Sequence, residues 1–124
     1  MRCHHGLRSR WPLRRFVVVE HSMAPMLQPG DGLLAVRCGD AKPGQVRVFP
    51  HPRGRAMFLV KRVDAVHHGG DGARFEARSD NASEPGVIDS RHFGPVPVRG
   101  SYRVVLAVRG GRVWPVRARR VRTR

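Results

Sequence analysis

Ser22 and Lys61 are the two residues of this chain whose types and settings could do chemistry together. Ser22 follows the apolar run 16–19 and precedes Pro25, which cannot donate a ladder hydrogen bond and so takes the chain out of a strand. Lys61 lies within 57–63, the most hydrophobic strand-like run. A serine hydroxyl attacks a carbonyl when a nearby base accepts its proton, and a neutral lysine amine can be that base.

Lys61 can act as a base only if its surroundings keep the amine neutral. Side chains alternate across a strand, so Lys61 shares a face with Met57, Leu59 and Val63. A lysine in water titrates near ~10.4, and burial lowers that pKa. Arginine stays protonated in proteins, yet only Lys42 and Lys61 among the 24 basic residues are lysines. The alternative is an edge-strand lysine whose ammonium reaches water.

Short strands joined by tight turns must position these two residues. The 124 residues suffice for one compact domain, and 14 Gly and 10 Pro separate short Val-rich runs. Because no crossover helices are indicated, we predict a mainly β fold, a small, twisted, partly closed antiparallel sheet or barrel. The expected strands cover 16–20, 32–37, 45–49, 56–66, 74–78, 102–109 and 112–116.

The chain is expected to divide into three parts. Residues 1–15 carry scattered Arg without a hydrophobic period and predict a flexible basic arm. Residues 16–116 form the folded domain, and 117–124 form a solvated basic tail. Within the domain, 79–100 reads as a long loop, and a loop of that length is usually functional.

Three sequence motifs resemble those of the signal peptidase I family. They occur in the family's order, with suitable spacing, and together they cover about residues 17–108. Such a combination is far more specific than any single motif. The nucleophile motif is Ser22-Met23-Ala24-Pro25-Met26-Leu27 with Gly30-Asp31, and the base motif is Leu59-Val60-Lys61-Arg62-Val63. The third, usually Gly-Asp-Asn and then Asp-Ser-Arg, is similar to Ser79-Asp80-Asn81 and Asp89-Ser90-Arg91.

The resemblance implies a serine endopeptidase with a Ser/Lys dyad, which needs no cofactor or metal. Ser22 would be the nucleophile and Lys61 the general base. In the third motif, Asp89 and Arg91 would form an ion pair that, with Ser90, holds the loop near the dyad. The implied domain is the β-rich type of the signal peptidases and repressor proteases.

The substrate is expected to bind as an extended peptide along a sheet edge. Met23, Met26 and Leu59 are the residues expected to line its cleft. Within the family, the chain is most similar to the maturation proteases of nickel-type superoxide dismutase. The substrate would then be a precursor protein, that dismutase precursor in particular, which loses an N-terminal extension. A general signal-peptidase-like protease is the alternative.

The third motif and the approach to Ser22 depart from the family pattern. Glu20 stands where some relatives carry a serine that helps the oxyanion hole, so only the Ser22 N–H can be assigned to that role. Val87 falls where a lysine-orienting serine is common, and this leaves Ser83 or Ser90 as substitutes. The spacing from the third motif's first half to its second is also about two residues longer than usual.

The net charge of +15 implies attraction to something acidic, such as nucleic acid, an anionic membrane surface or an acidic substrate. A non-enzymatic basic β domain that binds nucleic acid is therefore a second hypothesis. Trp11, Tyr102 and Trp114 are scattered, however, and no aromatic pair accompanies a basic strand, so stable nucleic-acid binding is not predicted.

Three further alternatives have less support. A self-cleaving repressor needs a DNA-binding segment ahead of the nucleophile, and no helix-turn-helix pattern precedes Ser22. A metal site at Cys3-His4-His5 or His67-His68 lacks the usual ligand spacing. His21 as a triad base is disfavoured because sequence neighbours generally point apart.

Location can be predicted only from what the chain lacks. No run approaches the ~20 apolar residues of a membrane-spanning helix, and Glu20 cuts short the apolar run after the basic start. Two cysteines are too few for a disulfide framework. We therefore expect a cytoplasmic protein without a transmembrane anchor.

Overall fold

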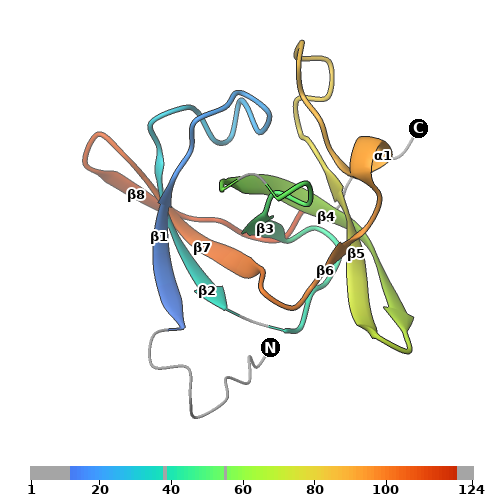
Figure 1. Ribbon diagram of the computed structural model, residues 1–124. Helices are drawn as coiled ribbons and strands as arrows, with labels where there is room; N and C mark the ends of the chain where they lie inside the picture. Colours follow the sequence, from blue (N-terminus) through green and yellow to red (C-terminus); the bar gives the residue numbers. More distant parts are fainter. Residues whose placement is uncertain (1–11, 38, 55, 120–124) are drawn as a thin grey trace.

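The computed structural model describes residues 12–37, 39–54 and 56–119, which form a mainly β structure (Figure 1). Eight antiparallel strands share one sheet, and the only helix of the described residues is four residues long. The elements are β1 (Leu13–Val17), β2 (Gly32–Arg37), β3 (Val46–Pro50), β4 (Phe58–Gly69), β5 (Gly72–Arg78), α1 (Ser90–Phe93), β6 (Val96–Pro97), β7 (Tyr102–Arg109) and β8 (Arg112–Pro115). The mainly β, antiparallel prediction is thus confirmed.

The strand order across the sheet is β1-β2-β7-β3-β4-β5-β6, and β8 pairs with β7. No pairing within the described ranges joins β1 to β6, so the sheet is not closed. Figure 1 shows these two terminal strands on opposite sides of the molecule. Across the same ranges, no helix is long and apolar enough to cross a membrane.

Alternation along β3 and β4 divides the buried apolar side chains into two clusters. The first cluster includes Val48, and Val60 packs against it. The second includes Phe49 and Leu59, the neighbours of those residues in sequence. The two central strands therefore contribute to both halves of the core, as the period of two requires.

The expected start of the domain at residue 16 is wrong, because β1 begins at Leu13. Leu13, Arg14 and Arg15 pair with β2 in register, so these residues already belong to the sheet. Arg14 also lies over aromatic rings, with its guanidinium carbon 4.8 Å from the centroid of the Phe58 ring. Phe58 belongs to a strand that is distant in sequence. The pattern of residues around Arg14 therefore could not reveal that this segment is part of the sheet. The rest of the expected arm, 1–11, lies outside the described residues.

The tail prediction holds only in part. Residues 117–119 are exposed, as expected. The Arg119 N–H nevertheless donates to the Gly44 carbonyl at 2.9 Å, and its guanidinium lies 3.4 Å from the Asp80 carboxylate. The start of the tail therefore docks on the turn before β3. Residues 120–124 lie outside the described part.

The expected loop 79–100 contains two short elements, α1 and β6. Asp89 caps α1 through its side chain, and His92 completes a capping box. Elements of four and two residues are too short to show a hydrophobic period, which explains why the sequence pattern missed them.

Candidate active site

Lys61 lies within β4, and its side chain is fully buried, at 0% exposure. Leu59 and Val63 belong to the second core cluster, and Met57 packs against that cluster. The intervening Val60 packs against the first cluster instead. The apolar row predicted around Lys61 is therefore present, and the alternative of a hydrated ammonium at a strand edge is wrong.

The Lys61 amine contacts a serine of the third motif. Its Nζ donates a hydrogen bond to Ser79 Oγ at 2.9 Å. Burial lowers the pKa of Lys61 below its ordinary value of 10.5, while the nearby carboxylates of Glu20 and Asp89 act in the opposite direction with less effect. A lowered pKa increases the neutral fraction of the amine near pH 7, which is what a general base requires.

Ser22 lies in the loop that follows β1 and is 1% exposed. Asn81 holds this loop, because its N–H donates to the Ser22 carbonyl at 2.8 Å and its side-chain amide donates to the His21 carbonyl at 2.9 Å. Within the described part of the chain, neither the Ser22 N–H nor its hydroxyl is used in a hydrogen bond. Both groups are therefore left without a hydrogen-bond partner in the described ranges, in a residue that is almost wholly buried.

The segment 79–81 connects the base motif to the nucleophile loop. Its first residue accepts the hydrogen bond from Lys61, and its last donates to Ser22. Its middle residue, Asp80, pairs with the buried Arg62, from Nε to Oδ1 at 2.8 Å and from Nη2 to Oδ2 at 2.7 Å. Lys61 and Ser22 therefore meet at one tripeptide, although no direct hydrogen bond joins their side chains among the described residues.

Asp89 anchors this tripeptide to α1. Its buried carboxylate accepts hydrogen bonds from the Ser79 N–H at 3.1 Å and from the Arg91 guanidinium at 2.9 and 3.2 Å. Burial raises the pKa of Asp89, but the hydrogen bonds from Arg91 and from backbone N–H groups together outweigh it and lower the pKa to about 2. The ion pair expected between Asp89 and Arg91 is present and supports the site through Ser79.

The serine that contacts Lys61 is Ser79, and neither Ser83 nor Ser90 takes that place. Ser83 is exposed, and the buried Ser90 hydroxyl has no hydrogen-bond partner within the described ranges. Sequence reasoning missed Ser79 because the family usually has Gly at this position. The alternation of side chains along β5 could have revealed it. Phe75 and Ala77 are buried alternate positions, and the next position in this series is Ser79.

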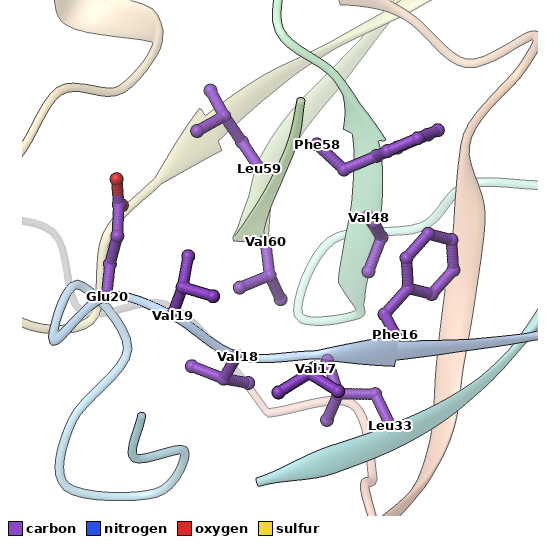
Figure 2. A pocket seen from close by; sticks show the side chains of 10 residues that line it. All are labelled: Phe16, Val17, Val18, Val19, Glu20, Leu33, Val48, Phe58, Leu59 and Val60. Carbon is purple, nitrogen blue, oxygen red and sulfur yellow. The ribbon is translucent and has the colours of Figure 1, made fainter. Parts of the chain in front are cut away.

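A pocket lies between the chain leading to Ser22 and the start of β4, although neither Ser22 nor Lys61 lines it (Figure 2). Figure 2 shows Glu20 at one end of this pocket and the rings of Phe16 and Phe58 at the other. The lining residues are Phe16, Val17, Val18, Val19, Glu20, Leu33, Val48, Phe58, Leu59 and Val60.

Only one of the three residues expected to line the cleft does so. Leu59 lines the pocket. Met23 is wholly buried in the first core cluster, where its sulfur accepts a hydrogen bond from the Asp80 N–H at 3.4 Å. Met26 is half-buried, packs against the same cluster and contacts Arg62 through its sulfur at 3.7 Å. Met23 is therefore too deeply buried to line a cleft, and Met26 is not part of this pocket, because the loop after Ser22 packs on the core.

Two incompletely paired strand edges flank this pocket. Residues 58–61 of β4 pair with β3 on one side, while pairing with β5 begins only at Arg62. β1 pairs with β2 and, within the described ranges, has no strand on its other edge. Free N–H and C=O groups along such edges are what an extended peptide needs in order to bind.

The end of the nucleophile motif is fixed by an ion pair that the sequence did not reveal. The buried Asp31 carboxylate accepts two hydrogen bonds from Arg109 of β7, both at 2.7 Å, and one from the Gln28 N–H at 2.8 Å. The hydrogen bond from Arg109 is the main cause that lowers the pKa of Asp31. Asp31 thus ties the turn after the nucleophile loop to the sheet.

The competing site residues are not assembled around Ser22. His21 is exposed, and its carbonyl is held by Asn81. In the described residues no group of three or more His, Cys, Asp or Glu side chains is placed to hold a metal ion. His67 instead pairs with Glu76 at 2.8 Å, and Cys3-His4-His5 lies outside the described residues.

Comparison with known proteins adds no assignment, since no protein-family model matches the chain and no curated protein matches its sequence.

Proposed function

We propose that the chain is a serine endopeptidase with a Ser22/Lys61 dyad, built on a β domain of the signal peptidase type. The observation that carries the proposal is the segment 79–81, which holds a fully buried lysine amine at one end and the serine loop at the other. Three motifs separated in sequence thereby meet at one place. The order of these motifs, together with their meeting, supports the family assignment.

The proposed mechanism begins with proton transfer from the Ser22 hydroxyl to the neutral Lys61 amine as the oxygen attacks a peptide carbonyl. The Ser22 N–H, which has no acceptor among the described residues, donates to the oxyanion. Protonated Lys61 then gives its proton to the leaving amine, and an acyl-enzyme remains on Ser22. Water hydrolyses this ester with Lys61 again as base.

Ser79 has a defined part in that mechanism. A neutral amine has two N–H groups and one lone pair, whereas an ammonium has three N–H groups and no lone pair. Ser79 Oγ accepts one N–H of Lys61 and so restricts the rotation of the amine. Ser79 is therefore a positioning residue that helps to direct the lone pair toward Ser22.

The proposed substrate is a polypeptide bound in extended form between the free edges of β1 and β4. The pocket there is lined mainly by apolar side chains, and it extends to Glu20, two residues before the nucleophile. On the strength of the resemblance, we propose a precursor protein with a removable N-terminal extension. The precursor of nickel-type superoxide dismutase is the specific substrate to test first.

The test compares the native chain with Ser22→Ala and Lys61→Arg on that precursor and on a proteome-derived peptide mixture. Mass spectrometry identifies new termini. We expect discrete cleavage by the native chain and background levels with both variants. Lys42→Arg is the matched control, because Lys42 is the other lysine and is exposed, and it should cleave normally. Native-level cleavage by either dyad variant would refute the proposal.

A further inference from the structure

Two arginines lie near the aromatic end of the pocket, opposite Glu20, although neither belongs to its lining. Arg14 lies over the rings of Phe16 and Phe58, with its guanidinium carbon 5.1 and 4.8 Å from their centroids, and both rings line the pocket. Arg37 lies nearby, because its Nη2 donates to Tyr102 Oη at 3.0 Å and its guanidinium carbon lies 5.5 Å from that ring. Arg14 lies 5.9 Å from the same ring. Both arginines are exposed.

These two guanidinium groups differ from the arginines that fix the fold. Arg62, Arg91 and Arg109 each pair, at 2.9 Å or less, with a carboxylate that is 11% exposed or less. Arg14 and Arg37 form no ion pair with any acidic side chain among the described residues. A guanidinium stacked on a ring still presents its planar N–H edge, which matches the two oxygens of a carboxylate.

Strand geometry connects this cationic end to the dyad. Arg14, Phe16 and Val18 alternate onto one face of the chain that leads to Ser22. A peptide paired along this segment advances one residue for each residue of the chain. The side chains that reach Phe16 and Arg14 are then about six to eight residues from the bond held at Ser22.

We propose that the pocket selects an extended peptide with acidic side chains about six to eight residues from the scissile bond, and that Arg14 and Arg37 bind them. This substrate class rests on the proposed peptidase function. An acidic occupant also fits the net charge of +15, because the complementary field draws such a peptide toward the chain. The distant carboxylates thereby fix the register of the peptide against Ser22.

Binding is measured on the Ser22→Ala chain, so that no probe is consumed. The probes are fluorescein-labelled 14-residue peptides of alternating Thr and Val with a central Ala, a Glu pair near one end or the other, and Gln counterparts. At ~0.15 M salt, where longer-range attraction is screened, we expect one Glu peptide to bind about tenfold more tightly than its Gln counterpart. Adding Arg14→Gln and Arg37→Gln should remove that difference.

The matched control is Arg99→Gln with Arg112→Gln, which removes the same charge from two exposed positions. This control should keep most of the preference, and Arg14→Lys with Arg37→Lys should keep part of it. The inference is overturned if Glu and Gln peptides bind alike, if neither binds, or if the control loses the preference as fully as the pocket variant. Equal thermal midpoints of all variants ensure that folded chains are compared.

Cleavage of the same peptides by the native chain separates the two proposals. Acid-selective binding that depends on Arg14 and Arg37, without any Ser22-dependent cleavage, would refute the peptidase and retain the recognition site. Ser22-dependent cleavage that is equal for Glu and Gln peptides would support the peptidase and refute the recognition site.

Discussion

Lys61 of β4 donates a hydrogen bond from its fully buried amine to Ser79 Oγ, at 2.9 Å. Ser79 follows the last residue of β5, and its own N–H is held by Asp89 at 3.1 Å. The Lys61 amine is thus held by a hydroxyl whose own residue is fixed by a buried carboxylate.

Ser79→Ala should reduce kcat by roughly tenfold or more and leave KM nearly unchanged, because it removes the acceptor that orients the base without altering the pocket. Steady-state kinetics on a peptide cleaved by the native chain checks this. Ser79→Thr, which keeps the hydroxyl, should recover much of the loss. Ser83→Ala removes an exposed serine and should have no effect. An unchanged kcat for Ser79→Ala would show that this hydroxyl does not position the base.

Activity should rise with pH as Lys61 loses its proton, with a midpoint below 10.5 because burial lowers the pKa of Lys61. The Glu20 carboxylate favours the protonated amine and opposes that effect. Glu20→Gln should therefore lower the pKa of Lys61 further and move the acid limb of kcat/KM to lower pH. Asp71→Asn removes an exposed carboxylate and should leave the limb unchanged. A limb that stays in place in Glu20→Gln would contradict this electrostatic account.

Lys61→Met should abolish cleavage and stabilise the fold. The pKa of Lys61 is lower in the folded chain than its ordinary 10.5, so between these two pKa values the unfolded chain binds more protons than the folded chain. Lys61 therefore destabilises the fold by its full amount when the pH is below its pKa in the folded chain. This destabilisation disappears when the pH is above 10.5. Replacing the amine with an apolar side chain should raise the free energy of unfolding at pH 7 by about 1–2 kcal/mol. Urea unfolding at several pH values measures it, and a destabilised variant would contradict the prediction.

Asp89 should make stability depend on pH in the acid range. Its pKa is lowered from 3.8 to about 2 in the folded chain, so its contribution is present above pH ~5 and is lost as the pH falls toward ~2. One pKa unit corresponds to about 1.4 kcal/mol, so the contribution is about 2 kcal/mol. Asp89→Asn should remove that part of the pH dependence, as seen in unfolding at pH 3 and pH 7.

Asp71→Asn is the control for this measurement as well, since the ion pair of Asp71 with Arg74 is exposed. Its effect should stay within about 0.5 kcal/mol. Acid unfolding of Asp89→Asn that matches the native chain at every pH would exclude the proposed role of the buried carboxylate.

Much of the site followed from local patterns. A period of two predicted the apolar row around Lys61, and the third motif predicted the ion pair between Asp89 and Arg91. The same period also runs from Phe75 to Ser79, so the partner of the base could have been found by extending β5 to its end. The features that follow from alternation along a single strand are therefore the ones that the sequence predicts best.

The features that were missed depend on contacts between distant segments. Arg14 belongs to β1 through its pairing with Ala35 of β2, and its guanidinium lies on Phe58 of β4. Asp31 is held by Arg109 of β7. Met23 is apolar and adjacent to the nucleophile, which fits a cleft as well as a core. Its burial follows from how the loop folds back on the sheet, and no local pattern encodes that path.

The most direct test of the account asks whether the amine of Lys61 acts on the side chain at position 22. The thiol introduced by Ser22→Cys is alkylated with iodoacetamide across a range of pH, and peptide mapping distinguishes it from Cys3 and Cys38. We predict that its apparent pKa is lower, by about one unit or more, than in the same variant carrying Lys61→Met, because a neighbouring ammonium stabilises the thiolate. Equal pKa values in the two variants, or no alkylation at position 22 in either, would contradict the dyad.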